Sequence, residues 1–292
     1  MKRQHQWEEI LLIGLLASFA IVLLVKHWAV KEVSATDPVM SVPVAMYHSV
    51  TDEGTSPGQY VISPSMLESD LKYLYEQGYH TVTVQDLLNY VNHGTHLPEK
   101  PVMLTFDDGY YNNYLYAYPL LQKYHMKAVL SPVAMLTQQF SQSDDSGHEV
   151  WSYCTGEQLK EMADSGVMEI QNHSYDFHEL NPRRGCLRKK GESKAAYREI
   201  FMKDTQQAQQ LFASLDIQPP ICYTYPYGAC NDETEALVTE CGLSVTLSCE
   251  EGIANIGRDS ACLRRIRRYN RDGRVSTKQF WEKLLMQAGE GG

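Results

Sequence analysis

Short apolar runs and amphipathic stretches alternate along most of the chain. Short strand-like runs occupy positions 42–47, 102–106, 128–133, 168–171, 221–225 and 243–247. The run at 102–106 is mostly apolar without polar alternation, which is typical of a strand covered on both faces. Between them, apolar residues recur every three or four positions, which predicts helices at 64–78, 85–90, 114–125, 155–165, 194–215, 233–240 and 277–286. Short strands are also expected at 81–84 and 263–266. This alternation predicts one α/β domain with parallel strands and about seven strand–helix units.

Side chains that can do chemistry follow several of these predicted strands. His48 ends the first apolar run, Asp107 and Asp108 end the second, and His173 comes just after the run at 168–171. A Pro-Tyr-Gly turn containing Tyr227 follows the run at 221–225. Active sites of (β/α) barrels gather at the carboxyl ends of the strands. We therefore expect a distorted (β/α)7-type barrel rather than an open sheet.

The adjacent carboxylates of Asp107 and Asp108 predict a polar site at a strand end. Neighbouring side chains on a strand point to opposite faces, so both acids can serve one site only if the backbone turns there. Gly109 permits such a turn. Two carboxylates this close repel each other unless a cation or a proton lies between them. One is expected to hold a metal ion and the other to act as a base; a helix cap or Asx-turn is the alternative.

His173 and His178 supply two imidazoles five residues apart. On an ideal helix this spacing separates the side chains by about 140°, and on a strand it puts them on opposite faces, so a strand end followed by a bent loop is needed. Two imidazoles and one carboxylate form a ligand set that suits zinc or another divalent transition ion. Either histidine alone is more often a hydrogen-bonded structural residue, but the pair together with the two aspartates favours a metal site.

The N-terminal segment carries an apolar block at 10–25, interrupted only by Ser18. As a helix the block is about 24 Å long, short of the roughly 30 Å hydrocarbon core, but Trp7 and Trp28 would lie about 32 Å apart, as interfacial aromatic belts do. We expect a short cytoplasmic tail and membrane anchor at 1–30, a linker at 31–39 and an extracytoplasmic domain at 40–288. A cleaved signal peptide ending near Ala35 is the alternative.

Composition narrows the range of partners. The net charge of −10 disfavours nucleic acid as a partner, and no phosphate-binding glycine motif points to a nucleotide cofactor. The seven cysteines are odd in number and irregularly spaced, so they define no disulfide framework. Two basic runs, at 183–194 and 264–274, are expected to be solvated loop surface; contact with an anionic wall polymer is the alternative.

Four motifs together resemble those of the polysaccharide deacetylases, the NodB-homology or carbohydrate esterase family four proteins. They are TFDDGY at 105–110, the segment 151–169 with MADSG at 162–166, HSYDFH at 173–178 and YPYG at 225–228. The resemblance covers roughly residues 40 to 288. It implies that Asp107 is the general base and that Asp108, His173 and His178 are metal ligands. It also implies that the backbone N–H of Tyr227 is an oxyanion donor.

The sequence departs from the common family pattern in three respects. The five-residue histidine spacing resembles the branch that acts on poly-N-acetylglucosamine. No histidine follows His178, and an early Tyr-His pair fills the role of general acid in that branch, so His48 becomes the candidate acid; a buried structural histidine is the alternative. The arginine that usually precedes the Pro-Tyr-Gly turn is absent, and Arg265 is a candidate to orient Asp107 in its place.

The resemblance implies a metal-dependent deacetylase, with zinc as the expected ion. Its substrate would be the N-acetyl groups of an extracellular polysaccharide that contains N-acetylglucosamine, either an exopolysaccharide or peptidoglycan. An esterase for O-acetyl glycans and a catalytically weak glycan-binding protein of the same fold remain alternatives. Tyr110 and Tyr227 are the aromatic residues expected near the site.

Overall fold

A computed structural model describes residues 39–52 and 56–289. The expected tail and membrane anchor at 1–30, and the linker except for Val39, lie outside the described residues. A search of the described part finds no helix with the length and apolar content needed to cross a bilayer.

Five parallel strands form the regular part of the central sheet. Their order is β12 (Tyr269–Asn270), β2 (Val44–Tyr47), β6 (Pro101–Asp108), β7 (Ala128–Pro132) and β8 (Met168–Ile170), and β5 (His80–Thr81) also pairs with the start of β6. All eight residues of β6 are buried, which accounts for its unbroken apolar pattern up to Asp107. The predicted α/β class with parallel strands is confirmed.

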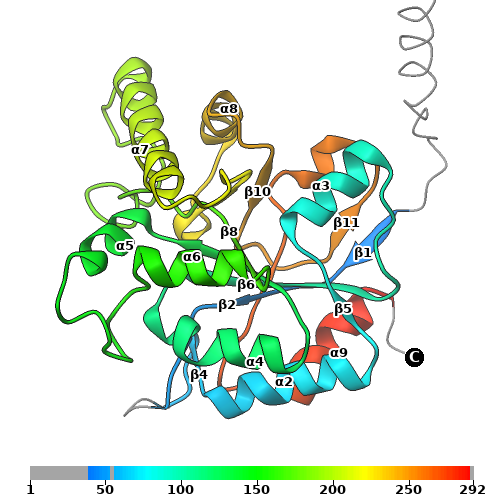
Figure 1. Cartoon of the computed structure of the whole chain (residues 1–292). Coiled ribbons are helices and arrows are strands. Elements are labelled where there is room, and N and C mark those ends of the chain that lie inside the picture. The colour runs from blue at the N-terminus through cyan, green and yellow to red at the C-terminus, as the bar shows by residue number, and fades with distance from the viewer. Residues whose placement is uncertain (1–38, 53–55, 290–292) are drawn as a thin grey trace, which may run out of the picture. The chain divides into compact units, whose positions relative to one another are not determined.

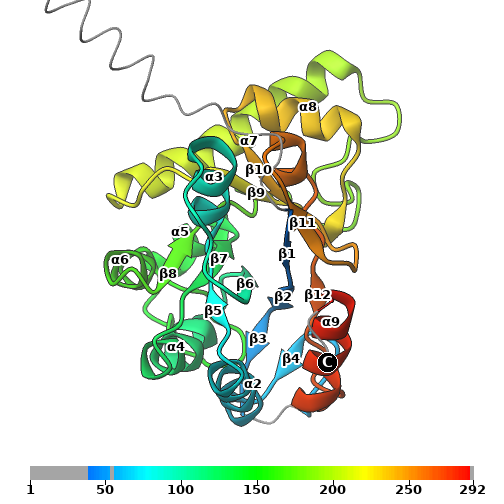
Figure 2. The same ribbon diagram turned by 90° about the vertical axis from the view of Figure 1, so that its right-hand side faces the viewer.

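Two further parallel strands continue this sheet through isolated bridges. β9 (Cys222–Thr224) pairs with β10 (Val245–Leu247), Asn172 after β8 bridges to Tyr223 of β9, and Leu247 of β10 bridges to Ile266, shortly before β12. The strands β2, β6, β7, β8, β9 and β10 therefore follow one another round to β12, which lies beside β2 (Figure 2). The regular ladders cover only part of the expected barrel, and the remaining neighbours meet at single bridges.

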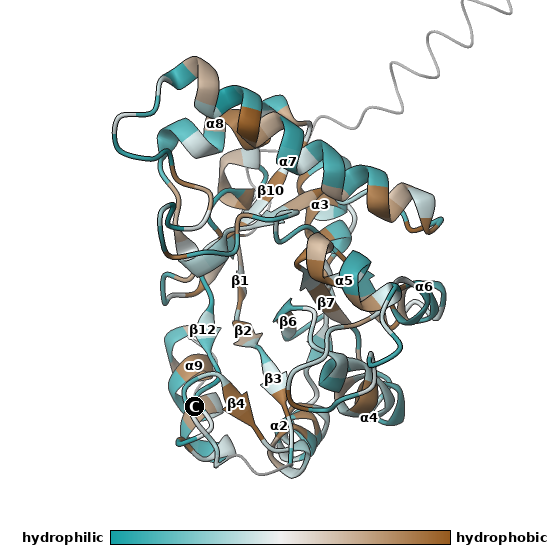
Figure 3. Ribbon diagram, turned by 90° about the vertical axis from the view of Figure 1, so that its left-hand side faces the viewer, coloured by the Kyte–Doolittle hydropathy of each residue, from teal (hydrophilic) through white to brown (hydrophobic). Residues whose placement is uncertain are grey.

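The helices lie around the strands rather than on one face (Figures 1 and 2). They are α2 (Pro64–Glu76), α3 (Val84–His93), α4 (Tyr118–Lys123), α5 (Ala134–Ser141), α6 (Gly156–Asp164), α7 (Lys194–Ser214), α8 (Asp232–Glu240) and α9 (Thr277–Gln287). Reciprocal capping boxes define the starts of α3, α6, α8 and α9. Figure 3 shows that hydrophobic and hydrophilic residues are separated in space: strands such as β7 inside are hydrophobic, and the outer turns of α6 and α7 are mostly hydrophilic.

Some predicted elements differ from the observed ones. The strand expected at 81–84 ends at Thr81, because Thr83 is the N-cap of α3 and exchanges hydrogen bonds with Asp86. The strand expected at 263–266 is wrong, because a 3₁₀ turn, Ser260–Leu263, occupies its start and only Ile266 forms a bridge. The helix expected at 114–125 begins with a π-helical segment, Asn113–Ala117, before α4.

Six of the described elements were not predicted. They are α5, β12 and two short strand pairs: antiparallel β1 (Met40–Val42) with β11 (Ala254–Ile256), and parallel β3 (Ser49–Val50) with β4 (Val61–Ile62).

The expectation that both basic runs are solvated is wrong for three arginines. Arg183 is buried between the rings of Phe177 and Tyr197. Arg268 and Arg271 are completely enclosed. Each of the three is paired with a carboxylate, because a buried guanidinium requires an opposite charge and hydrogen-bond acceptors.

Arg271 joins three elements through a fully buried ion pair with Asp70 of α2. Its Nε and Nη2 atoms donate to the two carboxylate oxygens at 2.7 and 3.1 Å. Tyr47 at the end of β2 and Thr277 at the start of α9 donate to the same carboxylate at 3.1 and 2.6 Å. This pair therefore holds α2 and α9 against the strand that leads to His48.

Replacing Asp70 with Ala should lower the free energy of unfolding by about 3–5 kcal/mol, because Arg271 would remain buried without its countercharge. Urea denaturation of the variant measures the loss. Glu76→Ala, in the exposed Lys72–Glu76 pair on the same helix, should change stability by less than about 0.5 kcal/mol. Equal stabilities for the two variants would contradict this account of the pair.

Candidate functional site

The turn at the end of β6 aims two neighbouring carboxylates into one cavity. Asp108 has a positive φ of 71° and Gly109 one of 79°. A Cβ on residue 109 would lie 2.5 Å from the Cβ of Pro132 and 2.9 Å from its Cα, so only glycine fits there. Because the backbone leaves the strand conformation at this point, Asp107 and Asp108 both line the cavity.

Asp108, His173 and His178 are brought together as a candidate metal site. Oδ1 of Asp108 lies 3.3 Å from Nε2 of His173 and 3.0 Å from Nε2 of His178. One potential ligand atom from each residue lies within 4.8 Å of the others. Nδ1 of His173 is 2.8 Å from the carbonyl oxygen of Thr224, so Nδ1 carries the proton and Nε2 is left to bind a metal ion.

The charge of Asp108 suits a residue that binds a metal cation. Burial by itself would raise the pKa of its carboxyl group, but the neighbouring imidazoles of His173 and His178 bring the pKa well below its usual range. The carboxylate is therefore anionic at neutral pH. Two imidazole nitrogens and one carboxylate oxygen match the ligand set of catalytic zinc sites, which leave a coordination position open. The residues present thus fit a divalent metal ion.

The bend between the two histidines is held by a carboxylate from α7. Asp204 accepts hydrogen bonds from the backbone N–H groups of Tyr175 and Asp176, at 2.9 and 2.8 Å. Burial raises the pKa of Asp204 to about 6, although both N–H groups favour its charged form. The sequence gave no sign of this contact, because Asp204 is 26 or more positions away from the histidines within an ordinary helical pattern.

Asp107 is oriented by Arg268, and the expectation that Arg265 does so is wrong. Nη1 and Nη2 of Arg268 donate to the two oxygens of Asp107, both at 2.8 Å. Burial opposes the charged form of Asp107, but the charge and hydrogen bonds of Arg268 bring its pKa below the usual value. Arg265 instead pairs with Asp232 and Glu235 at the surface. Arg268 was missed because it is one of several arginines in a run that looked solvated.

His48 lies in the same cavity, at the end of β2. Its carbonyl oxygen accepts a hydrogen bond from Nδ2 of Asn113 at 2.8 Å. Among the described residues, its buried Nδ1 has no hydrogen-bond partner. Burial is the largest influence and lowers the pKa of His48, while the negative charges of Asp107 and Asp108 oppose this shift.

Tyr227 and Tyr110 form part of the cavity wall. Tyr227 has a φ of 58°, and its hydroxyl group donates to the carbonyl oxygen of His178 at 3.1 Å. The rings of Tyr227 and His178 are 4.8 Å apart. The cavity has a volume of about 570 Å³. Its other lining residues are Met46, His48, Gln59, Tyr60, Asp107, Asp108, His173, His178, Leu180, Arg184, Cys249, Glu251 and Asn270.

Comparison with known protein families shows to which family the chain belongs. A family model described as polysaccharide deacetylase matches residues 94–246, which include both aspartates, both histidines and Tyr227. The chain belongs to the polysaccharide deacetylase family. The Bacillus subtilis (strain 168) protein YxkH is a similar relative, 30% identical over 232 residues that cover 80% of this chain and 73% of YxkH. The prediction of a polysaccharide deacetylase, a hydrolase of N-acetyl groups, is confirmed at the level of the family.

Two further relatives resemble this deacetylase. The poly-beta-1,6-N-acetyl-D-glucosamine N-deacetylase of Escherichia coli (strain K12) is 27% identical over 229 residues, which are 72% of this chain but only 34% of that enzyme. The solved structure of a de-N-acetylase from Aggregatibacter actinomycetemcomitans matches with a TM-score of 0.71 and 26% identity, covering 84% of this chain and all of the other. The fold therefore matches that of a family member.

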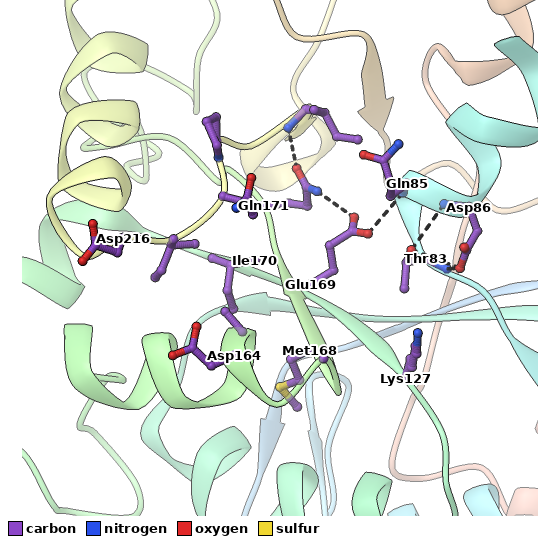
Figure 4. A pocket seen from close by; sticks show the side chains of 16 residues that line it. Thr83, Gln85, Asp86, Lys127, Asp164, Met168, Glu169, Ile170, Gln171 and Asp216 are labelled. Carbon is purple, nitrogen blue, oxygen red and sulfur yellow. Dashed lines mark hydrogen bonds between the residues drawn. The ribbon is translucent and has the colours of Figure 1, made fainter. Parts of the chain in front are cut away.

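A second cavity of the deacetylase, of about 390 Å³, lies at the opposite ends of the strands, where β7, β8 and β9 begin (Figure 4). Glu169 of β8 accepts hydrogen bonds there from the backbone N–H of Gln85 and the side chain of Gln171, at 3.1 and 2.7 Å. Gln171 in turn accepts from the N–H groups of Ile221 and Cys222. These bonds connect α3, β8 and β9, so the polar groups have a structural role. None of the predicted site residues lines this cavity.

Asp204→Asn should weaken zinc binding by roughly 10- to 100-fold, because an amide cannot accept from both loop N–H groups and the two histidines would lose their common orientation. Competition with a chromophoric chelator measures the zinc affinity of the deacetylase and the variant. Glu199→Gln, at an exposed position on the same helix, is the matched control and should bind zinc as the unchanged protein does. Unaltered affinity in Asp204→Asn would show that the loop keeps its shape without this carboxylate.

Proposed function

We propose that the protein removes N-acetyl groups from an extracellular polymer containing N-acetylglucosamine. One observation carries the proposal: the three potential metal ligands Asp108, His173 and His178 share a cavity with Asp107, a carboxylate that is not part of the ligand set. Asp107 is held by Arg268 instead. A metal site with a separately anchored base is the arrangement that metal-assisted hydrolysis requires.

In the proposed mechanism Asp108, His173 and His178 hold a divalent ion, with zinc as the first candidate. When bound, such an ion lowers the pKa of a water molecule and polarises a carbonyl group. Asp107 is anionic at neutral pH and accepts the proton of the attacking water. Arg268 aligns both carboxylate oxygens by its two hydrogen bonds and so acts as a positioning residue.

Two further residues are assigned roles in this proposal. His48 lines the same cavity as Asp107 and Asp108 and donates a proton to the departing amine. The backbone N–H of Tyr227 stabilises the oxyanion that develops on the acetyl group. The hydroxyl group of Tyr227 is bound to the histidine loop, which keeps this turn beside the candidate metal site.

The proposed polymer is β-1,6-linked poly-N-acetylglucosamine. Support comes from the five-residue spacing of His173 and His178 and from several relatives that are named as deacetylases of this polysaccharide. The Staphylococcus aureus relatives among them share 27% identity over 66% of this chain. Peptidoglycan is the other N-acetylglucosamine polymer that fits the same chemistry.

We also propose that the apolar block at 10–25 anchors the protein in the cell membrane, with residues 40–288 outside the cytoplasm. The support is the apolar composition of the block together with the spacing of Trp7 and Trp28 at its flanks. This location would place the enzyme next to an extracellular polysaccharide.

The function is tested by acetate release from β-1,6-linked N-acetylglucosamine oligosaccharides, chitin oligosaccharides, peptidoglycan fragments and O-acetylated xylan, with the zinc-loaded full chain. We expect release from the N-acetyl substrates, fastest from the β-1,6-linked ones. Removal of zinc by a chelator and Asp107→Asn should each reduce the rate by at least about 100-fold. Asp164→Asn, an exposed carboxylate on α6, is the control and should leave the rate unchanged.

Faster acetate release from O-acetylated xylan than from the N-acetyl substrates would identify the protein as an esterase. Oligosaccharide binding without any acetate release would identify a glycan-binding protein. In either case the proposed reaction would be wrong, whereas the metal content of the same sample would still show whether the ligand set is used.

Arg268→Lys should lower kcat roughly 100-fold with little change in KM, because lysine keeps the positive charge but cannot hold both oxygens of Asp107. Steady-state acetate release on the best oligosaccharide measures the two constants separately. Arg265→Lys is the matched control, and its kcat should stay close to that of the unchanged protein because Arg265 contacts Asp232 and Glu235 instead. A normal kcat in Arg268→Lys would contradict the positioning role.

A further inference from the structure

Four aromatic side chains form a continuous series that begins at the catalytic cavity. The ring of Tyr110 stacks on Tyr153 with centroids 4.9 Å apart, Tyr153 contacts Phe140 at 5.5 Å, and Phe140 contacts Trp151 at 6.1 Å. We refer to Tyr110, Tyr153, Phe140 and Trp151 as the aromatic ladder. Its first member lines the cavity, and its last is 44% exposed.

The segment that carries Trp151 and Tyr153 is fixed to the turn after β6. Tyr110 and Tyr153 form an antiparallel bridge. The N–H of Tyr111 donates to the carbonyl oxygen of Ser152 at 2.9 Å, and the N–H of Cys154 donates to that of Gly109 at 2.8 Å. The position of the ladder is therefore set by the same turn that aims Asp107 and Asp108.

Packing of the protein interior does not account for the ladder. In the part of the chain that the structure describes, none of its four members belongs to a hydrophobic core cluster. Tyr110 lines the same cavity as Asp108, and Tyr153 stacks on Tyr110, so the first two rings lie near the candidate metal site. At the far end, Trp151 stacks on His148 with centroids 4.7 Å apart, which holds the indole in place while nearly half of the residue stays in solvent.

We propose that the aromatic ladder binds the sugar residues that neighbour the one being deacetylated. The inference rests on the proposed function, since it names where the rest of the polymer lies when one acetyl group is in the cavity. Pyranose rings present flat faces of C–H groups, and aromatic rings offer a large, rigid apolar surface at low cost in conformational entropy. The ladder has no charged member, so it suits uncharged acetylated sugars better than an anionic polymer.

The ladder is joined to the catalytic cavity, which indicates that the same polymer occupies both. A polymer whose acetyl group reaches Asp107 has to leave the cavity on at least one side, and Tyr110 is at the same time a cavity wall and the first step of the ladder. A chain of several sugar residues would therefore contact Trp151, whereas a disaccharide would be confined to the cavity and the nearest rings.

The test compares binding of the β-1,6-linked N-acetylglucosamine hexasaccharide and disaccharide by calorimetric titration of the zinc-loaded full chain, with Asp107→Asn present in every protein compared so that the sugars are not appreciably turned over. Trp151→Ala should weaken binding of the hexasaccharide by roughly five- to tenfold and leave the disaccharide unaffected. Trp151→Phe keeps a ring and should retain most of the affinity. Tyr75→Ala, which removes an exposed aromatic residue of α2, is the matched control and should change neither affinity.

Equal hexasaccharide affinities for Trp151→Ala and the unchanged protein, or the same loss for both sugars, would overturn the proposal. Tryptophan fluorescence gives a second measurement. The hexasaccharide should quench the fluorescence of the unchanged protein more than that of Trp151→Phe, and the difference between the two reports on Trp151 itself. Sedimentation that shows a dimer dependent on Trp151 would assign the ladder to contact between two copies and would also overturn it. Failure to release acetate from the acetylated hexasaccharide would sink the proposed function, while the binding comparison would still decide the role of the ladder.

Discussion

Two carboxylates one residue apart repel each other, and the surroundings of β6 resolve this repulsion by giving each a different partner. Asp107 faces the guanidinium of Arg268, and Asp108 faces the imidazoles of His173 and His178. Both are buried, so the partners act in a medium of low dielectric constant where their effect on the charged form is large. The separation of a base from a set of metal ligands follows from this division, and the turn at Gly109 makes it possible.

The partners come from distant parts of the chain because parallel strands bring their carboxyl ends to one side. His48 ends β2, the two aspartates end β6, and His173 follows β8. Between β8 and β9 the only ladder contact within the described residues is the bridge of Asn172 with Tyr223, and the carbonyl oxygen of Thr224 just beyond it sets the tautomer of His173. The irregular part of the sheet thus contributes directly to the site.

Buried polar contacts behind the site hold these elements in place. Asp204 fixes the histidine loop from α7, and the Asp70–Arg271 pair fixes β2 against α2 and α9. Both are buried charges whose cost is offset only by complete sets of hydrogen bonds. The aromatic ladder differs from them, because it is attached to the site by backbone hydrogen bonds but turns its last ring toward solvent.

The amino-acid sequence by itself determined the strand–helix order, the residues of the candidate metal site and the family, because apolar periodicity and short motifs such as TFDDGY are local properties of the chain. It also placed Tyr110 and Tyr227 near the site. Only the tertiary structure decided which arginine meets Asp107, which helix supports the histidine loop and how the sheet continues past β8. Arg265 and Arg268 differ by three positions and look equivalent in sequence. Burial and pairing depend on contacts between residues more than 150 positions apart, and no local pattern records those contacts.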